Sequence, residues 1–205
     1  YLPGDLPQPL GLQQLQLQAT AAHGKLSGQF ELSSQMLGSA TAAVTLPLQQ
    51  TQSHWSISRE SPLQGSMRAA LTSLRSLNPL LGGNVHSDGE LRIEAGIHGT
   101  LQQPDISGKV SGTGLSLVLL EQGIHLQQGT LDAHFQHTDL HIDRLHFTSP
   151  HAPPPDNQLF RNLALKGAAG SLTITGKAGL TGNPSQIDFT IDQLPIAHKT
   201  DYWIV

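Results

Sequence analysis

The sequence predicts an all-β fold, for three reasons. Apolar and polar residues alternate with a period of two along almost the whole chain, which is the pattern of strands with one apolar face. Glycine and proline supply 21 and 13 of the 205 residues, and they interrupt the alternation at short intervals, as turns do. Only 13% of the residues are charged and 4% are aromatic. Such a composition also suits disorder, but the regular alternation favours strands with small side chains.

Strands are expected from the N-terminal part up to residue 58 and again from residue 89. The segment 89–99 has the clearest pattern, because its apolar residues fall on one face and its charged residues on the other. A turn with Pro104 then separates it from the next strand. The alternating apolar residues of these segments are Leu12, Leu15, Leu17, Leu26, Phe30, Leu32, Val44, Leu46, Leu48, Trp55, Ile57, Leu91, Ile93, Ala95 and Ile97.

One short helix is expected over residues 65–78. Met67, Leu71 and Leu74 recur there at helical spacing, and the polar residues fall mostly on the other side. Ser66 is a suitable N-cap, and Asn78 before a proline is expected to end the helix. We expect this helix to pack one face on the sheet, or to cap an open apolar groove.

The second half continues as strands whose apolar residues are Leu115, Leu117, Leu119, Leu131, Ala133, Phe135, Leu140, Ile142, Leu145, Phe147, Leu172, Ile174, Ile187, Phe189 and Ile191. The alternation slips between Ile142 and Leu145, which predicts a β-bulge near Asp143 and Arg144. Residues 149–158 include three consecutive prolines and are expected to form a loop. Because the same pattern resumes after it, we expect residues 1–205 to be one continuous β-rich piece of a longer protein.

Composition excludes several classes of function. A net charge of −4 with 11 basic residues argues against a nucleic-acid binder, which would carry a clustered basic surface. The chain has no cysteine, so disulfides and thiolate chemistry are excluded. No apolar run approaches the roughly 20 residues that cross a bilayer, so any membrane anchor is expected outside this sequence.

The motifs of enzymes are missing, and we expect neither catalysis nor a cofactor or metal. Asp88, Glu90 and Glu94 resemble a catalytic set, but Glu90 and Glu94 alternate on a polar strand face and are interpreted as solvated charges. Five histidines crowd into residues 134–151, namely His134, His137, His141, His146 and His151. They are expected on exposed strand faces. The alternative is a weak zinc site formed by His134 and His141, for which the spacing offers no further ligand.

The apolar face of the strands is the strongest functional signal. Such a face must be covered by another sheet, a helix or a ligand. A closed sandwich or barrel would make the chain a binding or adhesin-like module, whereas a curled open sheet would leave an apolar binding surface. A β-helix is not favoured, because no rung period near 20 residues is found.

Two stretches, 88–148 and 165–205, resemble the TamB family, the envelope-spanning component of the bacterial translocation and assembly module. The resemblance is carried by "DGELRIEAGIHGTLQQPDISGKVSGTGLSLVLLEQGIHLQQGTLDAHF", "DLHIDRLHFTS" and "GSLTITGKAGL", and by the preceding "WSISRESPLQGSMRAALTSLRSLNPLLGG". About two-thirds of the chain is covered, and the first 50 residues fit in composition alone. The histidine-rich and proline-rich segments are departures from the family pattern.

The resemblance implies a long, curved, mainly antiparallel sheet rolled into a groove, the β-taco, in a periplasmic region anchored in the inner membrane by a segment outside this sequence. It implies a TamA-type Omp85 partner in the outer membrane. It further implies conduction of phospholipid between the membranes, assembly of autotransporters and outer-membrane proteins, or both. The occupants of the groove would be phospholipid acyl chains or unfolded β-barrel clients. The expected lining residues are Leu91, Ile93, Ile97, Leu115, Leu117, Leu131, Phe135, Ile142, Ile174 and Phe189.

Overall fold

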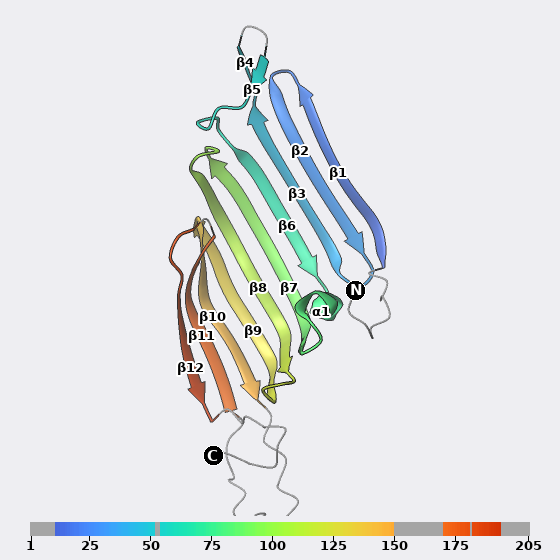
Figure 1. Ribbon diagram of the computed structural model, residues 1–205, viewed down its shortest axis with the longest axis vertical. Helices are drawn as coiled ribbons and strands as arrows, with labels where there is room; N and C mark the ends of the chain where they lie inside the picture. Colours follow the sequence, from blue (N-terminus) through green and yellow to red (C-terminus); the bar gives the residue numbers. More distant parts are fainter. Residues whose placement is uncertain (1–10, 52–53, 150–169, 181, 194–205) are drawn as a thin grey trace, which may run out of the picture.

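The structure is a computed structural model that describes residues 11–51, 54–149, 170–180 and 182–193. Ten strands of these ranges form one antiparallel sheet, in the order β1-β2-β3-β6-β7-β8-β9-β10-β11-β12, so each strand pairs with the next along the chain (Figure 1). Between β3 and β6, β4 and β5 form a small separate hairpin. The all-β prediction is confirmed.

The strands of the large sheet are β1 (Leu12–Ala22), β2 (Lys25–Ser34), β3 (Gly38–Pro47), β6 (Gln64–Leu71), β7 (Val85–Gly99), β8 (Pro104–Leu119), β9 (Ile124–His137), β10 (Asp139–Ser149), β11 (Gly170–Gly179) and β12 (Gln186–Asp192). The hairpin consists of β4 (Gln49–Thr51) and β5 (His54–Ser56). The helical residues are the 3₁₀ turn η1 (Leu74–Leu77) and the single-turn helix α1 (Asn78–Leu81).

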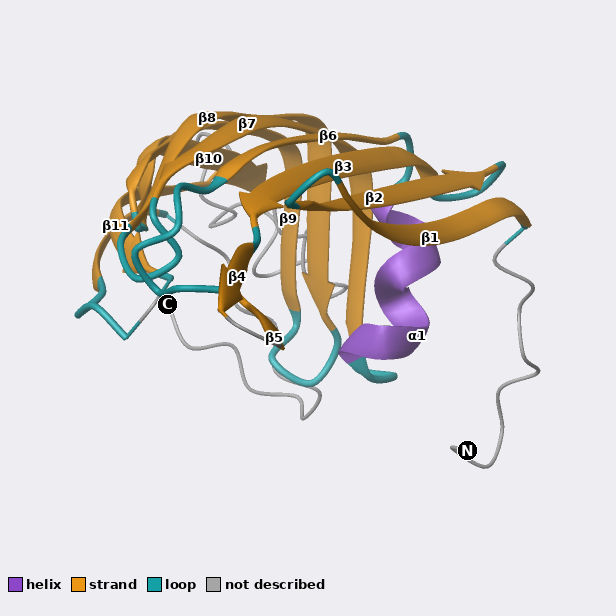
Figure 2. Cartoon of the chain, turned by 90° about the horizontal axis from the view of Figure 1, so that it is seen from above, coloured by secondary structure: helices purple, strands orange, loops and turns teal. Residues whose placement is uncertain are grey.

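The sheet is curved and open. Its first and last strands, β1 and β12, lie at opposite ends of the strand order and do not pair with each other, so the described strands form no closed barrel. Figure 2 shows the strands arching over a concave side, on which α1 lies. The long curved antiparallel sheet that the sequence analysis expected is therefore present.

Strand register places the apolar residues of all ten strands on one face. Directly paired residues of antiparallel strands project to the same side of a sheet. One row of successive partners crosses the whole sheet without a polar residue: Leu15, Leu32, Ala40, Ala69, Ile93, Val110, Ala133, Ile142, Gly176 and Ile187. We call this side of the sheet the apolar face and the other side the polar face.

The predicted bulge in β10 is confirmed. Its register shifts between Ile142 and Leu145 against β11, and between Ile142 and Arg144 against β9. One extra residue at Asp143–Arg144 keeps Ile142 and Leu145 on the same side, although they are three positions apart in the chain. The bulge therefore preserves the apolar face where strict alternation would have broken it.

The prediction of a helix over residues 65–78 is wrong. Residues 64–71 form β6, whose partners are β3 on one side and β7 on the other. The segment "QGSMRAAL" fits a period of two as well as a helical period, and its first six residues alternate between exposed and half-buried. Two neighbouring strands decided between these patterns, because tertiary pairing overrides weak local propensity. The helical residues follow Ser73, and Pro79 lies in the first turn of α1, where proline is tolerated.

The best-packed core lies where η1 meets the apolar face. Leu115, Leu126 and Phe147 are buried there, and Leu74 of η1 packs against them. On the proline-rich segment 149–158, only Ser149, the last residue of β10, is described; the rest of that predicted loop lies outside the described residues. Whether it forms a loop therefore stays a prediction.

Candidate apolar binding face

The ten predicted lining residues come from six neighbouring strands. Leu91, Ile93 and Ile97 lie on β7, and the others lie on β8 to β12. The register brings several of them into line: Leu91 and Leu131 both pair with Gly112, and Ile174 pairs directly with Phe189. The predicted residues therefore share one surface.

This surface has a sealed end and is open at its outer strands, while Ala95, Val110 and Ala133 in its middle strands are also buried. Leu115 retains 6% of its exposure and Leu126 only 2%. Leu117 and Leu131 pack partly buried against the same cluster. The expectation that Leu115 lines an accessible groove is therefore wrong, because this side chain is core. Phe189 at the other extreme is 64% exposed.

The apolar face also extends over β1 and β2, where no lining residue was predicted. Leu15 and Leu17 of β1 are 64% and 81% exposed, and they pair with Leu32 and Phe30 of β2. Their alternation was visible in the sequence. They were not named as lining residues because the resemblance covered this part of the chain in composition alone.

The polar face carries the charged residues. Arg92 and Glu94 alternate on β7 with the apolar residues of that strand, and Glu94 pairs with Arg68 of β6 and Lys109 of β8. Glu90 lies 3.8 Å from Arg92. The Glu90–Arg92 contact is an exposed ion pair of little energetic weight. Glu90 and Glu94 therefore agree with their interpretation as solvated charges.

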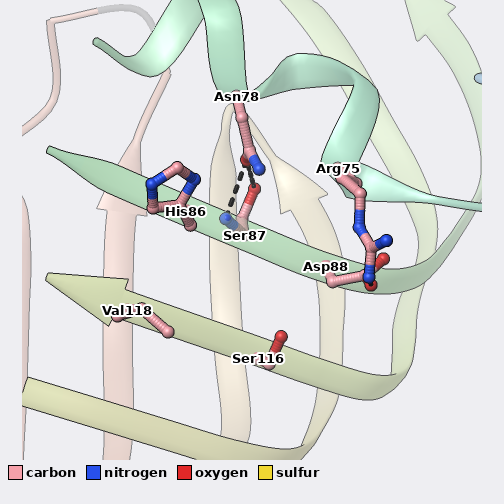
Figure 3. A pocket seen from close by; sticks show the side chains of 7 residues that line it. All are labelled: Arg75, Asn78, His86, Ser87, Asp88, Ser116 and Val118. Atoms are coloured by element: carbon pink, nitrogen blue, oxygen red, sulfur yellow. Dashed lines mark hydrogen bonds and ion pairs between the residues drawn. The ribbon is translucent and has the colours of Figure 1, made fainter. Parts of the chain in front are cut away.

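Asp88, by contrast, anchors the helical segment, because its carboxylate accepts hydrogen bonds from Ser73 and Arg75. A polar pocket of about 270 Å³ lies here, and its lining residues are Arg75, Asn78, His86, Ser87, Asp88, Ser116 and Val118 (Figure 3). Asn78 Oδ1 accepts hydrogen bonds from Ser87 N at 2.7 Å and from Ser87 Oγ at 2.9 Å. The Gly89 N–H, together with Arg75 and Ser73, lowers the pKa of Asp88. The pocket residues thus hold η1 and α1 onto β7.

Histidines of neighbouring strands meet on the polar face. His134 of β9 pairs with His141 of β10, and their rings stack with centroids 5.1 Å apart and an interplanar angle of 12°. His134 Nδ1 lies 2.8 Å from Asp143 Oδ2. Hydrogen bonds from Asn183 and Lys177 lower the pKa of the nearby Asp139. In the described ranges, no group of three or more histidines and carboxylates is placed to hold a metal ion.

Known proteins offer no match. Neither a family model, nor a curated protein, nor a solved structure is significantly similar to this chain. Within the described residues, no helix is long and apolar enough to cross a bilayer. Any function must therefore be argued from the apolar face and from the sequence motifs themselves.

Proposed function

We propose that this chain is a periplasmic segment of an envelope-spanning protein of the TamB type, and that its apolar face holds the acyl chains of phospholipids that move between the inner and outer membranes. One observation carries the proposal: an unbroken apolar row crosses ten strands, and its outer parts are open to solvent. A contiguous apolar surface that is exposed to water is typical of a binding site.

The chemistry of the face suits acyl chains. Each methylene that leaves water contributes about 0.8 kcal/mol, so a hydrocarbon tail gains affinity without any directed contact. The row of paired side chains contains leucine, isoleucine, valine, alanine and glycine but no hydrogen-bonding side chain. Such a surface binds hydrocarbon without distinguishing one head group from another, and a tail can slide from strand to strand.

A second candidate function is help in the assembly of autotransporters and other outer-membrane barrel proteins, together with a TamA-type Omp85 partner. The edge strand β1 favours it. Its eleven residues are all exposed, and none of them is charged or a proline. Charged residues and prolines are the residues that usually protect an edge strand from pairing. An unfolded client strand could add to this edge by β-augmentation, with its apolar side chains over the same face.

Site-specific photo-crosslinking in the periplasm tests the proposal. A hydrophobic photo-crosslinker at Ile93, Phe135 or Phe189 should capture phospholipid, detected by mass spectrometry. The matched polar-face positions are Arg92, Glu94 and Asp132, where no lipid should be captured. Equal lipid capture on both faces would contradict the proposal. Protein adducts without lipid at the apolar positions would favour the client-assembly function instead.

A further inference from the structure

We propose that His134 and His141 form a two-histidine binding site for a borderline transition-metal ion of the Zn²⁺ or Cu²⁺ class on the polar face. The two residues are direct partners across β9 and β10, and their rings are stacked 5.1 Å apart. Imidazole nitrogen is a preferred ligand for these ions. The site lies on the side of the sheet opposite to the apolar face, so it is independent of the proposed lipid function.

Asp143 prepares one ligand of this site. A carboxylate only accepts hydrogen bonds, so the 2.8 Å contact makes His134 Nδ1 the donor to Asp143 Oδ2. In the neutral ring, this leaves the lone pair on Nε2, which is the nitrogen available to a metal. A carboxylate behind a metal-binding histidine fixes the ring orientation and raises its basicity. The bulge that places Asp143 beside His134 therefore contributes to the site.

His141 supplies the second nitrogen. Its ring is half-buried and makes no hydrogen bond to a described residue. The side chain of His134 is 41% exposed and is held by Asp143, so His141 is the ring that turns when an ion binds. Because the two rings are nearly parallel, the lone pairs converge on one ion, at the roughly 2.0–2.1 Å of a metal bond, only after His141 tilts toward His134. Water would complete the coordination.

The surrounding charges do not repel a cation. Lys109 pairs with His134 from β8, and Lys177 pairs with His141 from β11. Lys177 is engaged by Asp139 at 3.1 Å. Arg144 faces Asp132 across β9 and β10. The carboxylates of Asp132, Asp139 and Asp143 balance the positive charges of Lys109, Lys177 and Arg144, so no net positive field opposes metal entry.

Calorimetric titration of the chain, prepared without a polyhistidine tag, with Zn²⁺ tests the proposal. One ion per chain should bind, and His134→Ala or His141→Ala should each remove this binding. Asp143→Asn should weaken it by roughly 10- to 100-fold, the usual effect of losing a carboxylate behind a metal-binding histidine. The matched control is His98→Ala, an exposed histidine of β7, which should bind like the unaltered chain.

A spectroscopic readout separates chelation by the two histidines from non-specific metal binding. Electron paramagnetic resonance of added Cu²⁺ should show two coordinating imidazole nitrogens in the unaltered chain, and this two-nitrogen signal should be absent in His141→Ala. Far-UV circular dichroism should be unchanged in all variants, because the altered residues lie on the surface. Binding that survives both alanine substitutions, or that His98→Ala weakens equally, would overturn the proposal.

Discussion

The ring of Phe147 on β10 fills the space that a side chain at Gly129 on β9 would occupy. A Cβ added at Gly129 would lie 2.4 Å from Cε1 of Phe147 and 2.7 Å from Cβ of Leu115. Phe147 and Leu115 belong to the buried cluster beneath η1. The absence of a side chain at Gly129 therefore allows the sealed end of the apolar face to close.

Gly129→Ala should consequently destabilise the protein. The added methyl group would force Phe147 out of the buried cluster, and overpacking of this kind costs about 1–3 kcal/mol. Urea unfolding measures the loss. The control is Gly83→Ala, because nothing lies within 4 Å of a Cβ at Gly83; it should change the free energy of unfolding by less than about 0.5 kcal/mol. Equal losses in both variants would contradict this account of the core.

The apolar face should contribute unevenly to stability. Leu126 is 2% exposed, and Leu126→Ala should lower the free energy of unfolding by about 2–5 kcal/mol. Leu17 is 81% exposed, and Leu17→Ala should change it by no more than about 0.5 kcal/mol. Both residues are leucines on strands of the large sheet, so the comparison isolates burial. A large loss at Leu17 would mean that its side chain is covered in solution.

Charge on the face should separate binding from folding. Phe189→Glu leaves the carboxylate in water, so the fold should survive, whereas acyl-chain binding near β12 should fall severalfold. Leu117→Glu would instead place a charge against the buried cluster, where an unpaired charge is strongly unfavourable. It should disrupt the sealed end. Fluorescent fatty-acid binding and circular dichroism of both variants measure these effects; loss of fold at Phe189→Glu would contradict the open surface.

The attachment of the helical segment should depend on pH. The Gly89 N–H, Arg75 and Ser73 lower the pKa of Asp88. Its stabilising contribution is therefore complete above the ordinary pKa of about 3.8, and it is lost as the pH falls through the lower folded pKa. The contribution is less than about 1 kcal/mol, because the ion pair with Arg75 is largely exposed.

Urea unfolding at pH 6 and near pH 2.5 tests this dependence. At pH 6, Asp88→Asn should be less stable than the unaltered chain. The difference should shrink at the lower pH, where Asp88 itself becomes protonated. The surface carboxylate Glu94 supplies the control, since Glu94→Gln should show no comparable difference. A gap between Asp88→Asn and the unaltered chain that grows on acidification would contradict the assigned role.

Local sequence was sufficient for much of the fold. Side chains of a strand alternate between two faces, so the order of apolar residues alone predicts which of them share a side. This is why the face containing Ile93, Ile142 and Ile174 could be anticipated, and why the slip after Ile142 predicted a bulge. The TamB resemblance and the functions it implies were also sequence inferences, and they stay proposals.

By itself, the sequence determined the β class, the apolar face and the bulge in β10, because these follow from spacing along the chain. Only the tertiary structure decided that residues 64–71 are a strand, since β3 and β7 had to lie on either side of them. It also decided that Leu115 is sealed while Phe189 is open, and that His134 meets His141. Burial and pairing depend on which strands become neighbours, and distant contacts rather than local spacing set that arrangement.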